Sequence, residues 1–239
     1  MEPGGSRALD GAGRPCEHAR MATVLSPGEV ESRPSLADWR VLDGRLAASF
    51  RSRTMVRGAE FVSRVVDVAE ALNHHPDLDL RFARVHLTLV THSAGGLTER
   101  DVALAERISE LARDMDVPAE PARCRSLAFA LPADDASAVA PFWQAVLGHR
   151  TAEGSKPVEL NDRDGRLPPV RLVGTGPGGR PCLEIHVAGE TLEDRVAQAT
   201  KAGGRIVDEA GMPARVVLAD AGGNLASLHT TRASHKSNS

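Results

Sequence analysis

The sequence predicts an α+β fold built from two consecutive units. In the first half, apolar residues alternate between strand and helix periods in the order hairpin, helix, strand, helix. In the second half, a strand–helix–three-strand pattern of roughly 50 residues occurs twice. The stiff, proline-containing segment 117–121 separates the halves. We therefore expect an irregular segment over 1–33, a first unit over 34–117, a linker over 118–123, a second unit over 124–231 and an irregular tail over 232–239.

Composition narrows the functional classes. The chain has 239 residues, 41% of them hydrophobic, and a formal net charge of −3, so its composition does not favour nucleic-acid binding. Its three cysteines form no CxxC pair, which indicates a reducing compartment rather than disulfides or a zinc–thiolate site. There is no apolar run long enough to span a membrane, and the N-terminus lacks the apolar core of a secretory signal. We expect a cytoplasmic protein from a bacterium, the origin that the preference for Arg over Lys suggests.

In the first unit, Asp43-Gly44 between short apolar runs predicts a two-residue hairpin turn. Residues 56–72 read as a helix whose apolar stripe comprises Val62, Val65, Val66, Ala69 and Leu72. Residues 80–90 read as one strand. Thr98 then begins a helix to about residue 114, with Asp101 placed to complete a capping box.

In the second unit, the pattern predicts a strand over 125–131 and a helix over 136–147, with strands near residues 158 and 170. The order then repeats, with a strand over 182–187, a helix over 192–202 and strands near residues 206, 216 and 225.

Three histidines could meet at one end of the first unit. His74 and His75 follow the first helix, and His92 follows the strand, to which a short connection over 77–79 leads. Because imidazole titrates near neutral pH, such a cluster could both donate and accept protons.

Simpler interpretations apply to each residue. A histidine at a helix end often only interacts with the helix dipole. Three histidines can also hold zinc, although no HxH or HxxxH pair with a carboxylate is present. Asp101 is a good capping residue whatever else it does.

The first half resembles the pterin-4a-carbinolamine dehydratases over roughly residues 36–113. The residues that carry the resemblance are Trp39, Leu46, Phe50, Phe61, Ala69-Glu70, the stretch 73–77 (Asn-His-His-Pro-Asp), 85–89 (Val-His-Leu-Thr-Leu), Thr91-His92, 96–101 (Gly-Leu-Thr-Glu-Arg-Asp) and Leu104-Ala105.

This resemblance implies an antiparallel sheet with helices on one face, and an enzyme that converts 4a-hydroxytetrahydrobiopterin to quinonoid dihydropterin without a cofactor or metal. It implies a pterin as substrate and a homodimer or homotetramer, while the composition predicts no nucleic-acid or membrane partner. His74, His75 and His92 become the catalytic residues, and His75, Pro76 and Asp101 the substrate-binding ones. One imidazole would protonate the 4a-oxygen and another would take the proton from N5. We assign His74 as the acid and His92 as the base.

The sequence departs from the family pattern at two positions. Leu78 stands where a Trp is common, and Phe82 replaces a common Tyr. The pterin contact could therefore be looser than in other members.

The second half resembles a glyoxalase-like domain of the vicinal-oxygen-chelate superfamily. The matching motifs are 142–148 (Phe-Trp-x-x-Val-Leu-Gly), 182–187 (Cys-Leu-Glu-Ile-His-Val), 202–204 (Ala-Gly-Gly) and 220–224 (Asp-x-x-Gly-Asn). Leu127, Ala128 and Ser227 stand near positions where the superfamily has metal ligands, which leaves His186, His229 and Glu184. We expect no metal, and His186 is read as a strand residue of a half-buried sheet.

Two alternatives to a dehydratase stay open at this point. The first unit could be a non-catalytic dimerisation or cofactor-type module. The second unit could carry the activity, as a glyoxalase-like lyase or dioxygenase, or could be a small-molecule binder. The complete histidine trio favours dehydration, because function depends on the site rather than on the fold.

Overall fold

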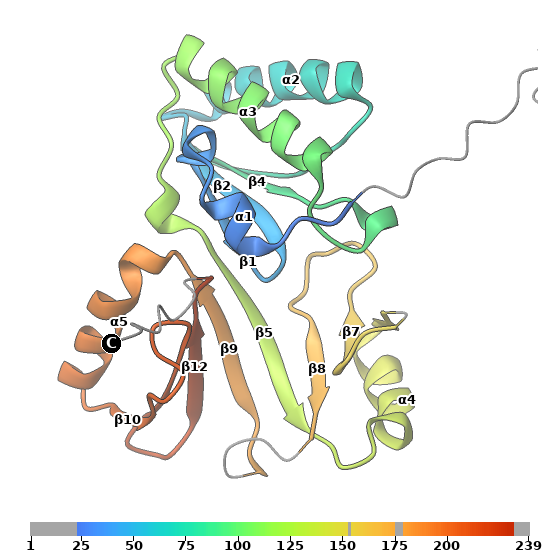
Figure 1. Cartoon of the computed structure of the whole chain (residues 1–239), viewed down its shortest axis with the longest axis vertical. Coiled ribbons are helices and arrows are strands. Elements are labelled where there is room, and N and C mark those ends of the chain that lie inside the picture. The colour runs from blue at the N-terminus through green and yellow to red at the C-terminus, as the bar shows by residue number, and fades with distance from the viewer. Residues whose placement is uncertain (1–22, 153, 175–178, 232–239) are drawn as a thin grey trace, which may run out of the picture.

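The computed structural model describes residues 23–152, 154–174 and 179–231. It contains a four-stranded sheet in the first half and an eight-stranded sheet in the second (Figure 1). The predicted α+β class is confirmed, with the antiparallel sheet and the repeated βαβββ order. No helix in the described part of the chain is long and apolar enough to cross a membrane.

The first sheet has the order β1-β2-β4-β3 and is antiparallel throughout. Its strands are β1 (Trp39–Leu42), β2 (Arg45–Arg51), β3 (Asp77–Arg81) and β4 (Arg84–Leu89). The predicted hairpin turn is confirmed, since Asp43 (φ 52°) and Gly44 (φ 71°) connect β1 to β2. Both residues adopt the left-handed conformation that a type I′ turn requires.

The predicted single strand over 80–90 is wrong. The chain makes a hairpin there, and the expected connection over 77–79 is itself part of β3. The turn lies at Phe82, which adopts a left-handed conformation (φ 46°) and is 75% exposed. A bulky aromatic residue rarely adopts this conformation, so the sequence gives no turn signal.

Helices α2 (Met55–Leu72) and α3 (Glu99–Asp114) cover one face of this sheet (Figure 1). Thr54 and Thr98 accept backbone hydrogen bonds as N-caps. The buried stripe of α2 is Gly58, Phe61, Val65 and Ala69, whereas the expected members Val66 and Leu72 are each 40% exposed. The buried face of α2 is therefore rotated from the predicted one, because Gly58 and Phe61, rather than Val66 and Leu72, pack against the sheet.

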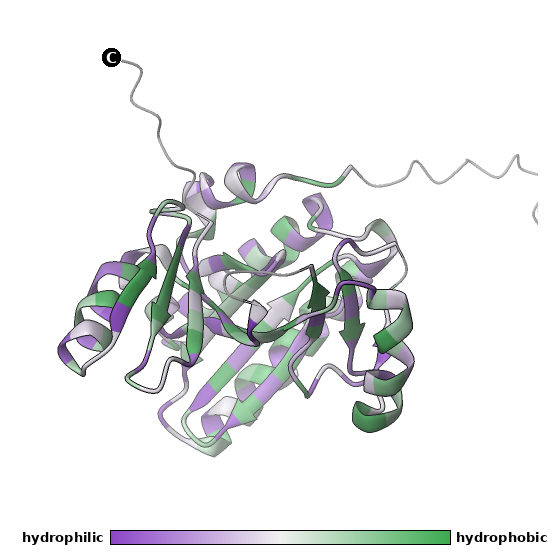
Figure 2. Ribbon diagram, turned by 90° about the horizontal axis from the view of Figure 1, so that it is seen from below, coloured by the Kyte–Doolittle hydropathy of each residue, from purple (hydrophilic) through white to green (hydrophobic). Residues whose placement is uncertain are grey.

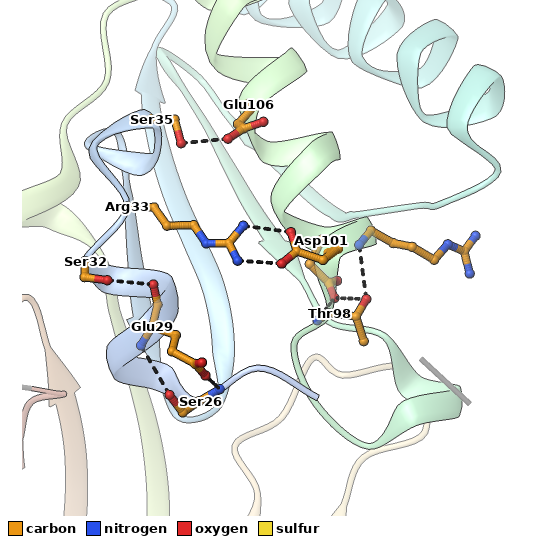
Figure 3. Close-up of polar contacts among 10 residues, drawn as sticks. Ser26, Glu29, Ser32, Arg33, Ser35, Thr98, Asp101 and Glu106 are labelled. Atoms are coloured by element: carbon orange, nitrogen blue, oxygen red, sulfur yellow. Dashed lines mark hydrogen bonds and ion pairs between the residues drawn. The ribbon is translucent and has the colours of Figure 1, made fainter. Parts of the chain in front are cut away.

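The expectation of an irregular segment over 1–33 is wrong for helix α1 (Pro27–Glu31), while residues 1–22 lie outside the described part. Ser26 caps α1 reciprocally with Glu29, as Figure 3 shows, and Val30 is fully buried in the core of the first unit. A single buried Val in a Gly- and Pro-rich stretch gives no period from which to predict a helix. The expected tail over 232–239 also lies outside the described residues.

The elements of the second unit are β5 (Arg125–Pro132), α4 (Ala136–Leu147), β6 (Arg150–Thr151), β7 (Val158–Asn161), β8 (Val170–Val173), β9 (Cys182–Val187), α5 (Leu192–Lys201), β10 (Arg205–Asp208), β11 (Arg215–Ala219) and β12 (Leu225–His229). The second sheet has the order β10-β11-β12-β9-β5-β8-β7-β6. Its two halves meet where β5 pairs antiparallel with β9, one strand from each repeat. Helices α4 and α5 pack against separate small cores, one for each repeat. In Figure 2 the ribbon of α5 alternates between hydrophilic and hydrophobic colours, as expected of a helix with one buried face.

One contact between the two units lies at the tip of the β1–β2 hairpin. Asp43 at this tip accepts two hydrogen bonds from Nη2 of Arg171 on β8, at 2.5 and 2.6 Å. The same guanidinium donates to Glu159 (2.8 Å) and Glu184 (2.7 Å). Burial alone would lower the pKa of Arg171, but its hydrogen bonds to the three carboxylates raise that pKa above its ordinary value. The side chain of Arg171 is only 13% exposed, so the joint is a largely buried charge cluster.

Candidate functional site

The end of α2 places His74. The helix ends at Leu72, and Asn73 adopts a left-handed conformation (φ 48°). This C-cap geometry turns the chain sharply. The next amide, that of His74, donates to the carbonyl of Ala69 at 3.1 Å. The His74 side chain points toward the start of α3 and is only 8% exposed.

The acceptor at the start of α3 is Asp101, which is completely buried. Its Oδ2 accepts hydrogen bonds from the Thr98 amide (2.7 Å) and from the Thr91 hydroxyl (2.6 Å). Figure 3 shows Asp101 and Thr98 together at the N-terminus of α3. Its Oδ1 lies 2.7 Å from Nε2 of His74. The predicted capping box is thus confirmed, and the same carboxylate also contacts a histidine.

This arrangement selects one tautomer of His74. An ionised carboxylate can only accept hydrogen bonds, so Nε2 of His74 must carry the hydrogen that it donates to Asp101. The other ring nitrogen, Nδ1, is then the one that can exchange a proton with a ligand. A histidine held in this way by a buried carboxylate has a fixed ring orientation as well as a fixed tautomer.

The other two predicted histidines lie at the surface. Nε2 of His75 is 3.1 Å from Oε1 of Glu70, and the two side chains are 55% and 70% exposed. His92 begins the short helix η2 (His92–Ala94) directly after Thr91, and it is exposed. Pro76, between His75 and β3, is half-buried. Within the described part of the chain, no hydrogen bond joins the three imidazoles to one another.

Two residues outside the predicted site, Thr91 and Arg100, connect these segments. Thr91, which is 4% exposed, anchors the end of β4 to Asp101 just before His92. Arg100 donates to the carbonyl of Asn73, just before His74. The first turn of α3 therefore holds both histidine-bearing segments. Thr91 directly precedes His92, and Arg100 directly precedes Asp101. This adjacency to predicted site residues is the sequence signal from which Thr91 and Arg100 could have been predicted.

The second unit contains a different pair of histidines. The rings of His186 and His229 stack, with centroids 4.9 Å apart, and Nε2 of His229 is 2.8 Å from the Ser227 hydroxyl. Burial, and secondly the charge of His186, lower the pKa of His229 to about 4, and burial lowers the pKa of His186. Glu184 is engaged by Arg171. Within residues 23–152, 154–174 and 179–231, no group of three or more His, Cys, Asp or Glu could hold a metal ion.

Comparison with known proteins gives a separate match for each half of the chain. Residues 23–111 match the family model described as "Pterin 4 alpha carbinolamine dehydratase". A protein of Mycolicibacterium smegmatis, named "Putative pterin-4-alpha-carbinolamine dehydratase", is 42% identical over 92 residues, which cover 38% of this chain and 98% of the relative. A protein of the same name from Thermosynechococcus vestitus is 41% identical, over 38% of this chain and 98% of its own length.

Residues 127–229 match the model described as a glyoxalase-like domain. Among solved structures, a transcriptional coactivator/pterin dehydratase from Brucella melitensis is 30% identical with a TM-score of 0.36, over 38% of this chain and 99% of its own. A glyoxalase/bleomycin resistance protein/dioxygenase superfamily member from Vibrio splendidus is 18% identical with a TM-score of 0.31, over 45% of this chain and 98% of its own. Since the chain spans nearly the whole length of relatives more than 40% identical to its first unit, it belongs to the pterin-4a-carbinolamine dehydratase family and carries a glyoxalase-like domain behind that unit.

Proposed function

We propose that the first unit dehydrates 4a-hydroxytetrahydrobiopterin to the quinonoid dihydropterin, and so takes part in tetrahydrobiopterin recycling. His74, His75 and His92 carry the reaction by general acid–base catalysis. The single observation that supports this most is the buried His74–Asp101 pair at 2.7 Å, which holds one imidazole in a single tautomer. Thr91, which directly precedes His92, donates to the same carboxylate.

The proposed chemistry requires one acid and one base. Protonated His74 donates a proton from Nδ1 to the 4a-oxygen, the C4a–O bond breaks, and water leaves. Neutral His92 takes the proton from N5 as the C4a–N5 double bond forms. The net reaction is loss of one water, and solvent exchange returns each histidine to its starting state.

Asp101 supports this division of roles. Its carboxylate fixes the orientation of His74 and would balance the positive charge of the protonated ring. His75, exposed and 3.1 Å from Glu70, has the freedom to contact the pterin ring, and Pro76 limits the backbone next to it.

A stopped-flow assay of 4a-carbinolamine dehydration tests the proposal. We expect His75→Ala and His92→Ala each to lower the dehydration rate at least tenfold, the low end of general acid–base effects. We expect Asp101→Asn to lower the rate as well, because the amide could turn its NH₂ group toward His74 and then favour the other tautomer.

His86→Gln is the matched control. His86 is half-buried on β4, on the sheet face opposite the helices, and should leave the rate unchanged. Turnover at the wild-type rate in both the His75 and His92 variants would exclude the mechanism.

We also propose that the protein is a homo-oligomer that assembles through α2. Met55 and Val66 are exposed, and Val62 is half-buried on the same side of this helix, beside its buried stripe. Val66→Glu should shift the sedimentation coefficient to that of a smaller species. An unchanged value would exclude this face as the contact.

A further inference from the structure

A cavity of about 390 Å³ lies at the junction of the two units. The first unit contributes the β1–β2 turn and the face of β2 and β4 that points away from the helices, including Ala47 and Thr88. The second unit contributes the start of β5 and the loop before β8. Cavities of this size commonly hold small organic molecules. The histidine site of the first unit does not line this cavity.

The acidic residues that line the cavity already have partners. Asp43 and Glu159 are held by the Arg171 guanidinium. Asp162 accepts hydrogen bonds from the amides of Arg166 (2.8 Å) and Leu167 (3.1 Å), and these bonds lower its pKa. Each of these carboxylates therefore already has hydrogen-bond donors within the protein.

Two of the basic residues have no such partner. The guanidinium groups of Arg125 and Arg166 form neither an ion pair nor a hydrogen bond with any residue in the described part of the chain. Arg125 also lines a second cavity of about 420 Å³, where Arg84 and Arg123 are both paired with Glu120. Arg125 is therefore the unpaired cation shared by both cavities, and Arg166 is a second unpaired cation in the first.

The rest of the lining suits an apolar body. Leu127 and Leu167 are 38% and 52% exposed, and Pro168 and Pro169 lie beside them. The hydroxyl of Ser126, also in the lining, is buried with no hydrogen-bond partner in the described structure. Apolar walls with a few polar groups are typical of small-molecule sites.

We propose that this junction cavity binds a small organic anion, with its carboxylate or phosphate on Arg125 and Arg166 and its apolar part against Leu127, Leu167 and the two prolines. The site needs residues of both units, and it is independent of pterin dehydration. It gives the second unit a ligand-binding role in which the first unit forms part of the wall.

A fluorescence titration of the full chain with anilinonaphthalene sulfonate, an aromatic anion, tests the proposal. We expect Arg125→Gln and Arg166→Gln each to raise the dissociation constant about fivefold, the effect of losing one partly exposed charged contact. Arg163→Gln, an exposed arginine of the same loop that does not line the cavity, should change it less than twofold.

Competition identifies the chemical class. Benzoate or phenyl phosphate should displace the probe, whereas neutral benzyl alcohol should not. Stronger competition by benzoate would indicate a carboxylate ligand, and stronger competition by phenyl phosphate a phosphate ligand. The proposal is overturned if the two arginine variants bind like the wild type, if Arg163→Gln weakens binding equally, or if benzyl alcohol competes as well as the anions. Both arginines are exposed, so circular dichroism should show folded variants, and the dehydration rate should not change.

Discussion

At Asp101, one carboxylate joins three segments of the first unit. It caps α3, accepts the Thr91 hydroxyl at the end of β4, and contacts His74 after α2. None of its surface is exposed, so none of these hydrogen bonds can be replaced by water. A group with so many buried partners affects stability as well as chemistry.

We therefore expect Asp101→Asn to lower the free energy of unfolding by about 2–4 kcal/mol, since a buried donor loses its charged acceptor. Urea unfolding would measure the loss. Asp114→Asn, an exposed substitution at the C-terminal end of the same helix, should change stability by less than about 0.5 kcal/mol. Equal midpoints for Asp101→Asn and the wild type would contradict this role.

His229 gives the second unit a pH dependence. Its folded pKa of about 4 lies below the ordinary 6.5, so the unfolded chain binds a proton first as pH falls. The contribution of His229 to stability is therefore fully present above pH 6.5 and is lost as the pH falls to about 4. Between pH 7 and pH 4.5, the free energy of unfolding should fall by about 1 kcal/mol less in His229→Gln than in the wild type. This figure is reduced because the His229 side chain is partly exposed to solvent. Parallel urea-midpoint profiles for variant and wild type would contradict this.

The helices and most strands could be predicted from the sequence because their signals are local. Thr98 and Asp101 form the capping box that the spacing predicts, and Asp43-Gly44 forms the predicted turn. The β3–β4 hairpin could not be predicted, because its turn depends on Phe82 adopting a conformation that the flanking strands impose.

That turn is a testable source of strain. Phe82 is exposed with φ 46°, a region that Asn tolerates better than an aromatic residue. We expect Phe82→Asn to raise the free energy of unfolding by about 0.5–1 kcal/mol. Phe82→Ala removes the same ring but keeps an ordinary Cβ, so it should give little gain. A loss of stability in Phe82→Asn, measured by thermal unfolding, would show that the ring itself stabilises the hairpin.

On the scale of the whole molecule, the junction between units depends on residues far apart in sequence. Asp43 and Arg171 are separated by 128 positions. The Asp43-Gly44 motif predicts a turn, but no sequence pattern pairs Asp43 with Arg171. The sequence therefore predicted the two units but not their joint or the cavity beside it. The candidate histidines could be selected from their local motif, whereas their burial could not, because exposure depends on how α3 packs.

Asp43→Asn separates the effect of charge from that of the turn, because Asn also suits a type I′ turn. Losing the contact to Arg171 should weaken docking of the units by about 1–3 kcal/mol. Trypsin cleaves after Arg123, in the linker, when the units separate. Cleavage should therefore become about tenfold faster for each 1.4 kcal/mol of docking free energy that is lost. Asp116→Asn removes an exposed partner of Arg53 within the first unit and should leave cleavage unchanged. Wild-type cleavage of the Asp43 variant would contradict the joint.

The hairpin tip has a consequence for how the chain is made. During synthesis, the β1–β2 turn is complete long before the strand that carries Arg171 leaves the ribosome. Until then, the carboxylate of Asp43 at the hairpin tip is hydrated. The nascent second sheet then closes around a carboxylate that is already in place. We therefore expect a chain that stops after residue 117 to fold by itself. A chain that starts at residue 124 would lack Asp43, one of the three carboxylates that surround the Arg171 guanidinium.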